Sequence, residues 1–550
     1  MARTYDDTMF IDTFEHEFTW LSGFLRNVRR FPLRPAVLDP DVGKMWTYEA
    51  LNREANALAQ TLQKEGVSRG NVVMTLLKNS PEAAFCYCGV RKIGAVLLTA
   101  NFNLSERELS LLISHNSPVA IIASTSCAFL VSRVLSSLET PPKILVAAKE
   151  KNDENIPNEF VSYEEFVRNA SFDEPKIDFR PHIYDEVLRL CTSGTTALPK
   201  CVPINDINEV LSAHDVIMHY PLYPCDVTMN MTPWFHRGGV HSGGLCPSFY
   251  AGATVVVMRT FRPQTTLDWV SRYKINFLMG SPANLEMLSR SQEKKNRDLS
   301  TLRGIVTMGA PLSKSNCIRF MQTLTPRIFN GYGTTETFWN SFLRPFDLPV
   351  GAGTVGNVCF DDDVRVVSLK DGATFEDTVK ADGKTEGEII IRSAGKSTFT
   401  YIGNEQAAKE KFRAGWMFTG DTGTWDVSGV VTVRGRKDDM MVVSGENIYP
   451  EQIEQAIKEN KRVLDALVTS VPDSLRGEVV VAYVVPSDDS LSIRELAEFC
   501  SQSSVLPSYK KPRYFSLVSS LPLTATGKKK RNEMKIRAKD DFLHGRLKKV

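Results

Sequence analysis

The chain is 550 residues long, which is more than one hydrophobic core can hold, so two or more domains are expected. Lys and Arg number 66 and Asp and Glu number 64, and the resulting net charge of +2 argues against a general nucleic-acid or membrane-surface binder. Hydrophobic residues make up 42% of the chain, which is ordinary for a globular protein.

Targeting and redox signals indicate a cytoplasmic protein. The first twenty residues carry acidic side chains and lack an apolar core, so no signal peptide is expected. No uninterrupted apolar run reaches about 18 residues, so no transmembrane helix is expected. The 10 cysteines form no C-x-x-C motif, and we expect free thiols in a reducing compartment.

Short β-rich apolar runs alternate with helical segments in the first half of the chain. We expect a helix over 48–65 and strands over 72–77, 119–123, 144–147 and 254–258. This alternation predicts an α/β fold, with a large N-terminal domain of α/β subdomains whose sheets are covered by helices.

The pattern changes near Arg434, where a strand over 430–433 is followed by a compact charged turn. Beyond it we expect strands over 466–471 and 479–485 and amphipathic helices over 450–458 and 493–501. The sequence therefore predicts an N-terminal domain over 1–435, a hinge over 436–438 and a small mobile α+β domain over 439–550.

A loop rich in hydroxyl groups follows the apolar run 187–190. Residues 192–200 read Thr-Ser-Gly-Thr-Thr-Ala-Leu-Pro-Lys. Glycine lets the backbone approach a ligand, amides and hydroxyls donate to phosphate oxygens, and lysine adds positive charge. A solvated polar turn is the alternative interpretation. The spacing excludes a Walker A motif.

Four other motifs could suggest functions that the sequence context does not support. The Gly-x-Gly-x-x-Gly pattern at 351–356 lacks a preceding strand and a following helix, so a dinucleotide site is not expected. Two histidine pairs, 214/219 and 236/241, are each five apart, and no carboxylate-rich partner set is evident for zinc. The basic run 528–531 fits a catalytic turn better than a nucleic-acid patch, and 361–363 fits a solvated acidic turn.

Seven further segments occur in a fixed order after the loop. They are Pro233–His236, Gly309–Pro311, Tyr332–Glu336, Thr419–Asp421, Gly435–Asp439, Gly445–Pro450 and Thr524–Lys528. Together with the loop, this ordered set resembles the adenylate-forming superfamily of acyl- and aryl-CoA ligases, peptide-synthetase adenylation domains and luciferases. The resemblance extends from about residue 30 to about residue 535.

The resemblance implies a two-step reaction in which a carboxylate is joined to AMP and then passed to the thiol of coenzyme A. Bringing two anions together calls for a cation, a metal ion on the phosphates and a loop for pyrophosphate. By resemblance, Lys528 bridges the carboxylate and the α-phosphate, Glu336 holds Mg²⁺ and Thr335 contacts the α-phosphate. ATP, Mg²⁺ and coenzyme A are the cofactors expected.

The resemblance also assigns binding roles. The expected ATP and AMP contacts are Thr192, Ser193, Gly194, Thr195, Thr196 and Lys200 in the loop, Gly309, Ala310 and Pro311 against adenine, Tyr332 on the adenine face with Gly333 and Thr334, and Asp421 and Arg436 at the ribose. For the second step, Asp438 is expected at the hinge, Gly445 in the pantetheine channel, and Arg476, Tyr509 and Lys511 at the coenzyme A nucleotide.

The acyl pocket is expected to contain His236, Arg237, Met308, Gly331 and Asn340, and His236 gates the carboxylate site. The segments around 236 and 336–341 resemble those of benzoate- and chlorobenzoate-type CoA ligases, so an aromatic or cyclic acid is expected. Arg237 replaces an apolar residue that is common there. It either meets a second polar group on the substrate or points away.

Three alternative functions stay open. They are a short- or medium-chain acyl-CoA synthetase, an adenylating enzyme that loads a carrier protein, and a non-catalytic nucleotide-binding relative. The expected partners are small molecules and not nucleic acid, with no integral membrane segment, and a homodimer is an allowed assembly.

The loop departs from the usual Thr-Gly-x-Pro-Lys-Gly at two positions, which hold Ala197 and Cys201. Alanine resists φ > 0 by on the order of 1 kcal/mol, so we expect a stiffer or differently sampled loop. Cys201 is expected to make the loop sensitive to thiol reagents.

Overall fold

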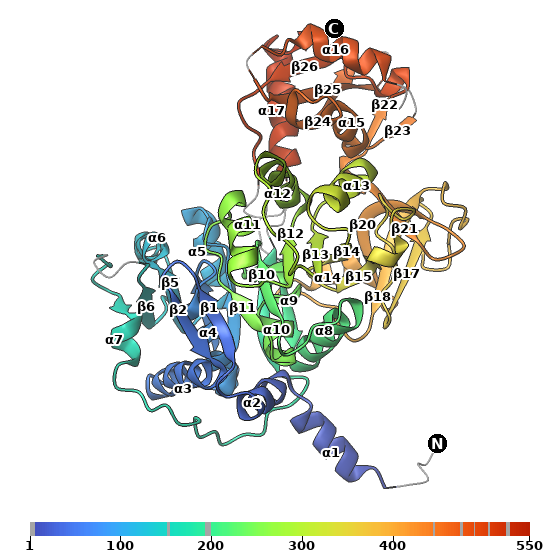
Figure 1. The fold of residues 1–550 in the computed structure, drawn as a ribbon. Helices are drawn as coiled ribbons and strands as arrows, with labels where there is room; N and C mark the ends of the chain where they lie inside the picture. Colours follow the sequence, from blue (N-terminus) through green and yellow to red (C-terminus); the bar gives the residue numbers. More distant parts are fainter. Residues whose placement is uncertain are drawn as a thin grey trace.

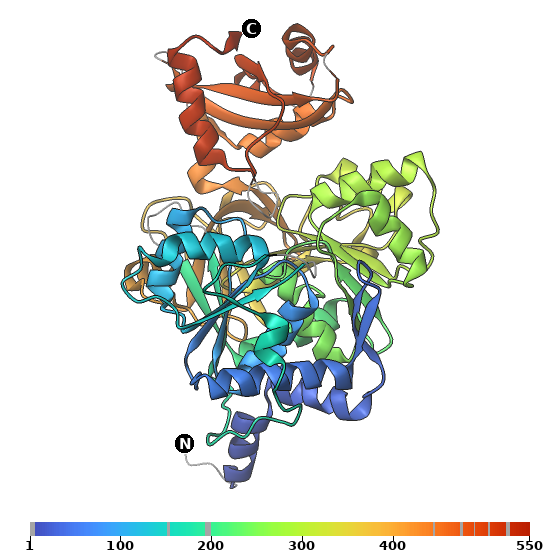
Figure 2. The same cartoon turned by 90° about the vertical axis from the view of Figure 1, so that its left-hand side faces the viewer.

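The computed structural model describes residues 6–150, 155–192, 200–443, 446–473, 477–488, 490–503, 506–523 and 529–550. Within these ranges four β-sheets form the framework. Two large sheets, mostly parallel and covered by helices, build the body of the molecule, and the C-terminal sheet stands above it as a separate lobe in both views (Figures 1 and 2). The expected α/β fold with a large N-terminal and a small C-terminal part is confirmed.

The first large sheet has the order β7-β6-β5-β3-β4-β8-β9 and is parallel except for the antiparallel pair β8–β9. Its strands are β3 (Val72–Leu76), β4 (Val96–Thr99), β5 (Ala120–Ser124), β6 (Ile144–Ala148), β7 (Val161–Ser162), β8 (Glu186–Thr192) and β9 (Lys200–Asn205). One face is packed against α5 (Glu106–Asn116) and α6 (Thr125–Leu135). The short helix α7 (Tyr163–Val167) follows β7.

The second large sheet has the order β16-β15-β14-β13-β12-β10-β11-β1-β2. Its strands are β1 (Pro35–Asp39), β2 (Lys44–Thr47), β10 (Val227–Asn230), β11 (Thr254–Val256), β12 (Phe277–Gly280), β13 (Gly304–Met308), β14 (Ile328–Thr334), β15 (Phe338–Leu343) and β16 (Asn357–Val358). Helices α11 (Pro263–Arg272), α12 (Pro282–Lys294) and α13 (Lys314–Thr323) share a core with its outer face.

The main core lies between the two large sheets. It unites apolar residues from strands of both sheets with those of several helices, among them α2 (Trp20–Arg30), α3 (Tyr48–Lys64), α4 (Pro81–Lys92), α8 (Asp206–His219) and α10 (Leu245–Ala251). Side-chain caps set several of these helix starts: Ser80 caps α4 ahead of Pro81, and Asn205 and Asn208 form a capping box on α8. Helix α1 (Thr8–Glu17) projects from the end opposite the C-terminal lobe (Figure 1).

The two remaining sheets follow one another in the chain. The third contains β17 (Asp362–Val367), β18 (Gly387–Ser393), β19 (Phe412–Arg413), β20 (Trp416–Trp425) and β21 (Val431–Arg436), with α14 (Glu405–Lys411) beside it. The fourth contains β22 (Met441–Val443), β23 (Glu446–Ile448), β24 (Val463–Asp473), β25 (Gly477–Pro486), β26 (Tyr514–Leu517) and β27 (Lys548–Lys549). It packs with α15 (Pro450–Lys458), α16 (Ile493–Gln502) and α17 (Arg531–Leu543).

The expectation of a solvated acidic turn at 361–363 is wrong for its middle residue. The Asp362 side chain is buried, its carboxylate pairs with Lys396 Nζ at 2.8 Å, and it accepts from Asn340 Nδ2 at 2.8 Å. The positive charge of Lys396, which lies further along the chain, therefore offsets the cost of burying this carboxylate. The Gly-x-Gly-x-x-Gly pattern at 351–356 is followed by strand β16 and not by the helix that a dinucleotide-binding site needs.

The histidine pairs do acquire carboxylate neighbours, contrary to expectation. His219 lies with Asp215 and Cys359, and His241 lies with Glu209 and Cys246, in two buried groups. The Asp215 carboxylate pairs with Lys396, and the Glu209 carboxylate pairs with Arg91. Both groups therefore have charge partners within the fold. Among the described residues, no helix combines the length and the apolar character needed to cross a membrane.

Candidate active site

The expected adenine- and phosphate-contacting segments meet where β13 and β14 end. Met308 of β13 is in register with Gly331 of β14, so the exposed turn 309–311 lies beside the last residues of β14, which begin with Tyr332. The carboxyl ends of parallel strands are the usual ligand-binding edge of an open α/β sheet. The register therefore brings together the adenine-wall segment and the Tyr-Gly-Thr-Thr-Glu segment.

A tight connection between β14 and β15 presents Glu336. A Cβ atom at Gly333 would lie 1.6 Å from the carbonyl oxygen of Phe338, so only glycine allows the two strands to approach this closely. The turn is held by a chain of bonds in which Thr334 Oγ1 lies 2.9 Å from Thr337 Oγ1, and Thr337 Oγ1 donates to Asn340 Oδ1 at 2.6 Å. Asn340 is fully buried and also donates to Thr337 O and Asp362, so in this structure its amide supports the turn.

The expected ribose-binding residues are joined directly. Tyr332 Oη donates to Asp421 Oδ2 at 2.7 Å, and Arg436 Nη1 donates to Asp421 Oδ1 at 2.8 Å. Adjacent strands bring the last two together, because Asp421 of β20 is in register with Arg436 of β21. Burial, and then the Asp421 carboxylate, raise the pKa of Tyr332 well above its ordinary value, so the phenol remains a donor.

A second group surrounds Glu336. Tyr401 Oη donates to Glu336 Oε1 at 2.5 Å, and Lys200 Nζ lies 5.7 Å from the centre of the Tyr401 ring. Lys411 Nζ donates to Thr419 O at 2.7 Å. Burial lowers the pKa of Lys411, against the attraction of the nearby Glu336 and Asp421 carboxylates. The half-buried Glu336 carboxylate, near Lys411 and bonded to Tyr401, fits Mg²⁺ held together with phosphate oxygens.

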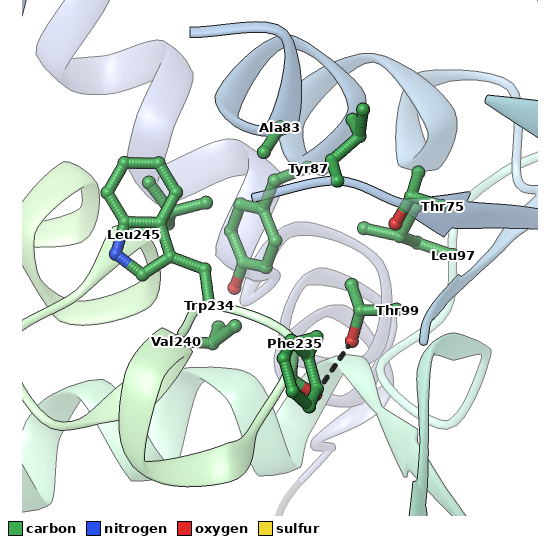
Figure 3. A pocket seen from close by; sticks show the side chains of 10 residues that line it. Thr75, Ala83, Tyr87, Leu97, Thr99, Trp234, Phe235, Val240 and Leu245 are labelled. Atoms are coloured by element: carbon green, nitrogen blue, oxygen red, sulfur yellow. Dashed lines mark hydrogen bonds between the residues drawn. The ribbon is translucent and has the colours of Figure 1, made fainter. Parts of the chain in front are cut away.

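The loop that carries His236 is fixed by buried amides. Asn230 Nδ2 donates to the carbonyl oxygens of Gly238, Gly239 and Ser242 at 3.0 to 3.1 Å and so shapes the short helix α9 (Arg237–His241). A Cβ at Gly239 would lie 1.8 Å from Pro233 O, so this turn also requires glycine. Thr99 Oγ1 donates to Phe235 O at 3.2 Å (Figure 3).

A small cavity lies beside this loop. Trp234, Phe235, Val240 and Leu245 line it together with residues of β3, β4 and α4 (Figure 3). Its volume of about 20 Å³ suits a water molecule. It is too small to admit a carboxylic acid.

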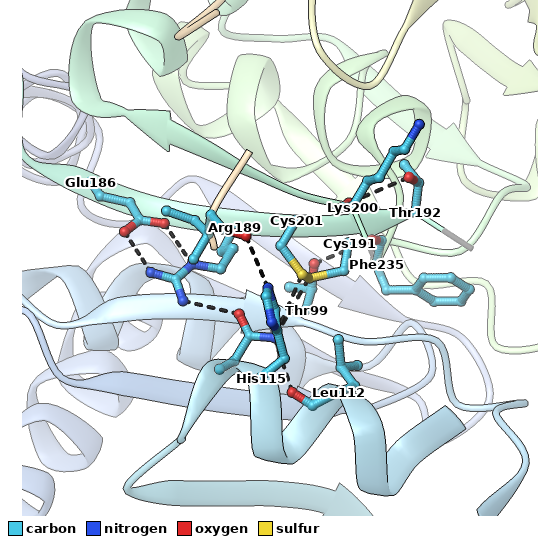
Figure 4. The surroundings of a disulfide bond; sticks show 12 residues. Thr99, Leu112, His115, Glu186, Arg189, Cys191, Thr192, Lys200, Cys201 and Phe235 are labelled. Atoms are coloured by element: carbon cyan, nitrogen blue, oxygen red, sulfur yellow. Dashed lines mark hydrogen bonds and ion pairs between the residues drawn. A yellow bond between two sulfur atoms is a disulfide. The ribbon is translucent and has the colours of Figure 1, made fainter. Parts of the chain in front are cut away.

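The phosphate loop begins and ends on an antiparallel strand pair. Thr192 Oγ1 of β8 donates to Lys200 O of β9 at 3.3 Å. The next pair along, Cys191 and Cys201, forms a disulfide with Cα atoms 4.0 Å apart (Figure 4). The expectation of free thiols is therefore wrong for this pair. Cys201 is also buried, which removes the basis for its expected reactivity toward thiol reagents. Ser193, Gly194, Thr195 and Thr196 lie outside the described residues.

The C-terminal part frames the segment of the expected catalytic lysine. Lys528 itself lies outside the described residues, but Leu523 and Lys529 on either side of 524–528 form a β-bridge. Lys529 Nζ pairs with Glu454 Oε2 at 2.8 Å, and Arg531 Nη1 pairs with Glu454 Oε1 at 2.7 Å. Two described residues of the basic run, Lys529 and Arg531, are thus tied to a buried carboxylate.

The structure describes some of the residues expected at the hinge and at coenzyme A. Asp438 lies in a short 3₁₀ turn between β21 and β22 with its side chain 85% exposed. Tyr509 packs against the core of the C-terminal sheet, and Lys511 Nζ donates to Ser501 O at 2.5 Å. Gly445 and Arg476 lie outside the described residues. Thr335 lies between Thr334 and Glu336, partly exposed.

Sequence reasoning missed Tyr401 and Lys411. Both come from the region around the third sheet and meet Glu336 and Asp421 only through the fold. No local motif marks either residue. Lys411 lies ten positions before Asp421, and that spacing is the one signal that could have suggested it.

Comparisons with known proteins agree with this geometry. The family model described as AMP-binding enzyme matches residues 24–399, and the model described as AMP-binding enzyme C-terminal domain matches 452–528. A 4-chlorobenzoate–CoA ligase of Arthrobacter sp. is 28% identical over 525 residues, covering 92% of this chain and 93% of the relative. An indoleacetate–CoA ligase of Aromatoleum aromaticum is 28% identical over 501 residues, covering 89% of this chain and 92% of the relative.

A solved structure shows the same fold. The anthranilate CoA ligase AuaEII in complex with anthranoyl-AMP superposes with a TM-score of 0.85 at 23% identity, covering 96% of this chain and 98% of that one. The first family model spans more than half of the chain. The chain therefore belongs to the AMP-binding enzyme family and is an AMP-forming acid–thiol ligase.

Proposed function

We propose that the protein is a carboxylate–CoA ligase that acts on an aromatic or cyclic carboxylic acid. The observation that carries the proposal is the joining of two residue groups around one edge of the sheet, Tyr332–Asp421–Arg436 and Tyr401–Glu336 with Lys200. The names of the two relatives support an aromatic acid. ATP, Mg²⁺ and coenzyme A are the cofactors of the reaction.

The residues divide the work of the first step. Asp421 is an acceptor suited to the ribose hydroxyls, and Tyr332 and Arg436 hold its carboxylate in place. Lys200 and Lys411 supply positive charge where the phosphates collect. Bound at Glu336, Mg²⁺ would neutralise phosphate charge. Lys528 is proposed to bring the carboxylate to the α-phosphate, and Thr335 to bind that phosphate.

The second step is proposed to use the other lobe. The short connection at 436–438, with the exposed Asp438, is proposed as the hinge about which the C-terminal domain turns. Gly445, Arg476, Tyr509 and Lys511 are proposed to bind coenzyme A. A cytoplasmic location and a homodimer remain predictions.

The test is AMP release from ATP and Mg²⁺ with and without coenzyme A, across benzoate, cyclohexene carboxylate, hydroxycinnamate and fatty acids of two to ten carbons. Strong coenzyme A-dependent turnover on a cyclic acid is the expected result. Turnover confined to fatty acids would contradict the cyclic substrate. Carboxylate-dependent AMP formation that coenzyme A does not affect would contradict the ligase in favour of a carrier-loading enzyme.

A further inference from the structure

Arg237 is one of the residues that the sequence resemblance assigns to the acyl pocket. It follows His236 and opens α9, and the residue is only 4% exposed. Its guanidinium carbon lies 5.5 Å from the centre of the Phe338 ring, just beyond the Glu336 turn. Arg237 is therefore buried in the protein, and both alternatives left open by the sequence, a second polar group on the substrate or a side chain that points away, stay open at this point.

The guanidinium uses only one of its three nitrogens. Nη2 donates to Ser212 Oγ at 3.0 Å and to Lys396 O at 3.3 Å. Nε and Nη1 are buried and make no hydrogen bond to any described residue. Because Nε carries one N–H and Nη1 carries two, most of the donor capacity of this side chain is left without an acceptor.

The surrounding carboxylates are bonded to other groups. Glu209 pairs with Arg91 at 3.1 Å and with His241 at 2.5 Å, and Glu336 accepts from Tyr401. Asp215 pairs with Lys396. Burial lowers the pKa of Arg237, and the attraction of Glu209 only partly offsets this. Arg237 is thus a buried cation without an ion-pair partner among the described residues.

A buried charge is costly unless an opposite charge and hydrogen bonds compensate it. Arginine, with its planar array of donors, is suited to bind carboxylates. Two apolar side chains also lie nearby: the Phe338 ring faces the guanidinium, and the Met308 side chain lies against Gly238, where an added Cβ would be 3.2 Å from its sulfur. Arg237 is thus a cation with unused donors that has both polar and apolar neighbours.

We propose that the acid activated by this enzyme carries a second carboxylate, remote from the reacting one, and that Arg237 binds it. This inference rests on the proposed function and names its substrate class. A phenol would not serve as well, because with a pKa near about 10 it stays neutral and leaves the charge of Arg237 uncompensated. Arg237 therefore determines which acid is bound, whereas Lys528 binds the carboxylate that reacts.

The experiment compares matched acids on the wild-type enzyme and on Arg237→Met. The pairs are benzoate with phthalate, isophthalate and terephthalate, cyclohexanecarboxylate with cyclohexane-1,3-dicarboxylate, and butyrate with glutarate. AMP release gives kcat/KM for each, and the shift in melting temperature with each acid plus AMP measures binding without turnover. Arg392→Met is the control, since Arg392 is an exposed arginine paired with Asp363.

The wild type is expected to favour at least one dicarboxylate over its matched monocarboxylate by about tenfold or more, as a charged hydrogen bond of about 1.5 kcal/mol or more would give. Arg237→Met should reverse that preference while Arg392→Met keeps it. The unliganded Arg237→Met protein should melt no lower than the wild type, because methionine leaves no buried charge. Arg237→Lys, which keeps the charge but loses the planar donors, should keep part of the preference.

Three results would overturn the proposal. The first is an Arg237→Met enzyme whose ratio of kcat/KM for dicarboxylates to kcat/KM for monocarboxylates is unchanged. Together with a lower melting temperature, this result would show that Arg237 stabilises the fold and does not bind substrate. The second is an equal loss for every acid, which would place Arg237 on the reacting carboxylate. The third is a wild type that neither binds nor turns over any dicarboxylate better than its partner. Should no acid yield AMP, the ligase proposal fails, and the melting shifts still decide on Arg237.

Discussion

Removing one hydroxyl group tests the geometry around Glu336. Tyr401→Phe deletes the donor that lies 2.5 Å from Glu336 Oε1 and leaves the ring in place beneath Lys200 and against Phe412. Burial, with the Glu336 carboxylate, raises the pKa of Tyr401, so the phenol is protonated and donates throughout the working pH range. The substitution therefore removes one hydrogen bond and little else.

The magnitude follows from the charge on the acceptor. A hydrogen bond to an ionised group contributes about 1.5–3 kcal/mol, so kcat/KM for ATP should fall by about 10- to 150-fold if the bond is kept in the transition state. Because the hydroxyl orients the carboxylate proposed to hold Mg²⁺, the concentration of Mg²⁺ needed for half-maximal rate should rise as well.

The assay is pyrophosphate release at varied Mg²⁺ and fixed ATP. Tyr483→Phe is the matched control, since its hydroxyl donates to Asp541 Oδ2 at 2.8 Å in the C-terminal lobe, another buried phenol–carboxylate pair far from Glu336. The control should lower the melting temperature without changing the Mg²⁺ dependence. A Tyr401→Phe enzyme with the wild-type rate and Mg²⁺ dependence would refute the role given to Tyr401 and weaken that of Glu336.

Three other changes have defined outcomes. Asp421→Asn should raise KM for ATP by about tenfold or more, because it weakens the acceptor that Tyr332 and Arg436 hold; an unchanged KM would remove Asp421 from the ribose site. Burial opposes ionisation of Glu454, but Lys529 and Arg531 outweigh it and lower its pKa to about 2 from 4.5. The contribution of the Glu454 carboxylate to stability is thus complete above pH 4.5 and is lost as the pH falls toward 2. Glu454→Gln should lower the free energy of unfolding by up to about 3 kcal/mol at pH 7, and denaturant titrations should show a weaker dependence of that free energy on pH. Ala197→Gly should change turnover more than ATP affinity, and an equal rate would contradict the stiff-loop hypothesis.

Local patterns predicted the elements well and distant partners poorly. The helix expected over 450–458 is α15, Pro450–Lys458, because an N-terminal proline and a 3.6-residue apolar period are local signals. The disulfide was missed because it depends on the register of β8 and β9, which sets Cys191 opposite Cys201. Asp362 was misread for the same kind of reason, since its partner Lys396 lies in a different part of the chain.

The ordered motifs predicted three residues that the structure brings together, and the structure adds two that no motif contains. Tyr332, Asp421 and Arg436 come together as their segments implied. Tyr401 and Lys411 belong to segments whose role depends on how the third sheet packs against the second, so nothing in their own neighbourhood identified them.

Two buried arginines, Arg91 and Arg237, differ in whether the fold supplies a carboxylate partner. Arg91 and Arg237 are 5% and 4% exposed, and the sequence does not show which partners they meet. Arg91 meets Glu209, 118 positions away, and its guanidinium lies over the rings of Trp20 and Tyr87, so the fold supplies its counter-charge. Arg237 has the same burial without that partner. Replacing Arg91 should therefore destabilise the protein, because it removes the arginine that pairs with the buried Glu209 carboxylate, whereas replacing Arg237 should spare stability and change which acid is bound. The melting temperature should therefore fall in Arg91→Met and not in Arg237→Met, which would distinguish an arginine that stabilises the fold from one that binds the substrate.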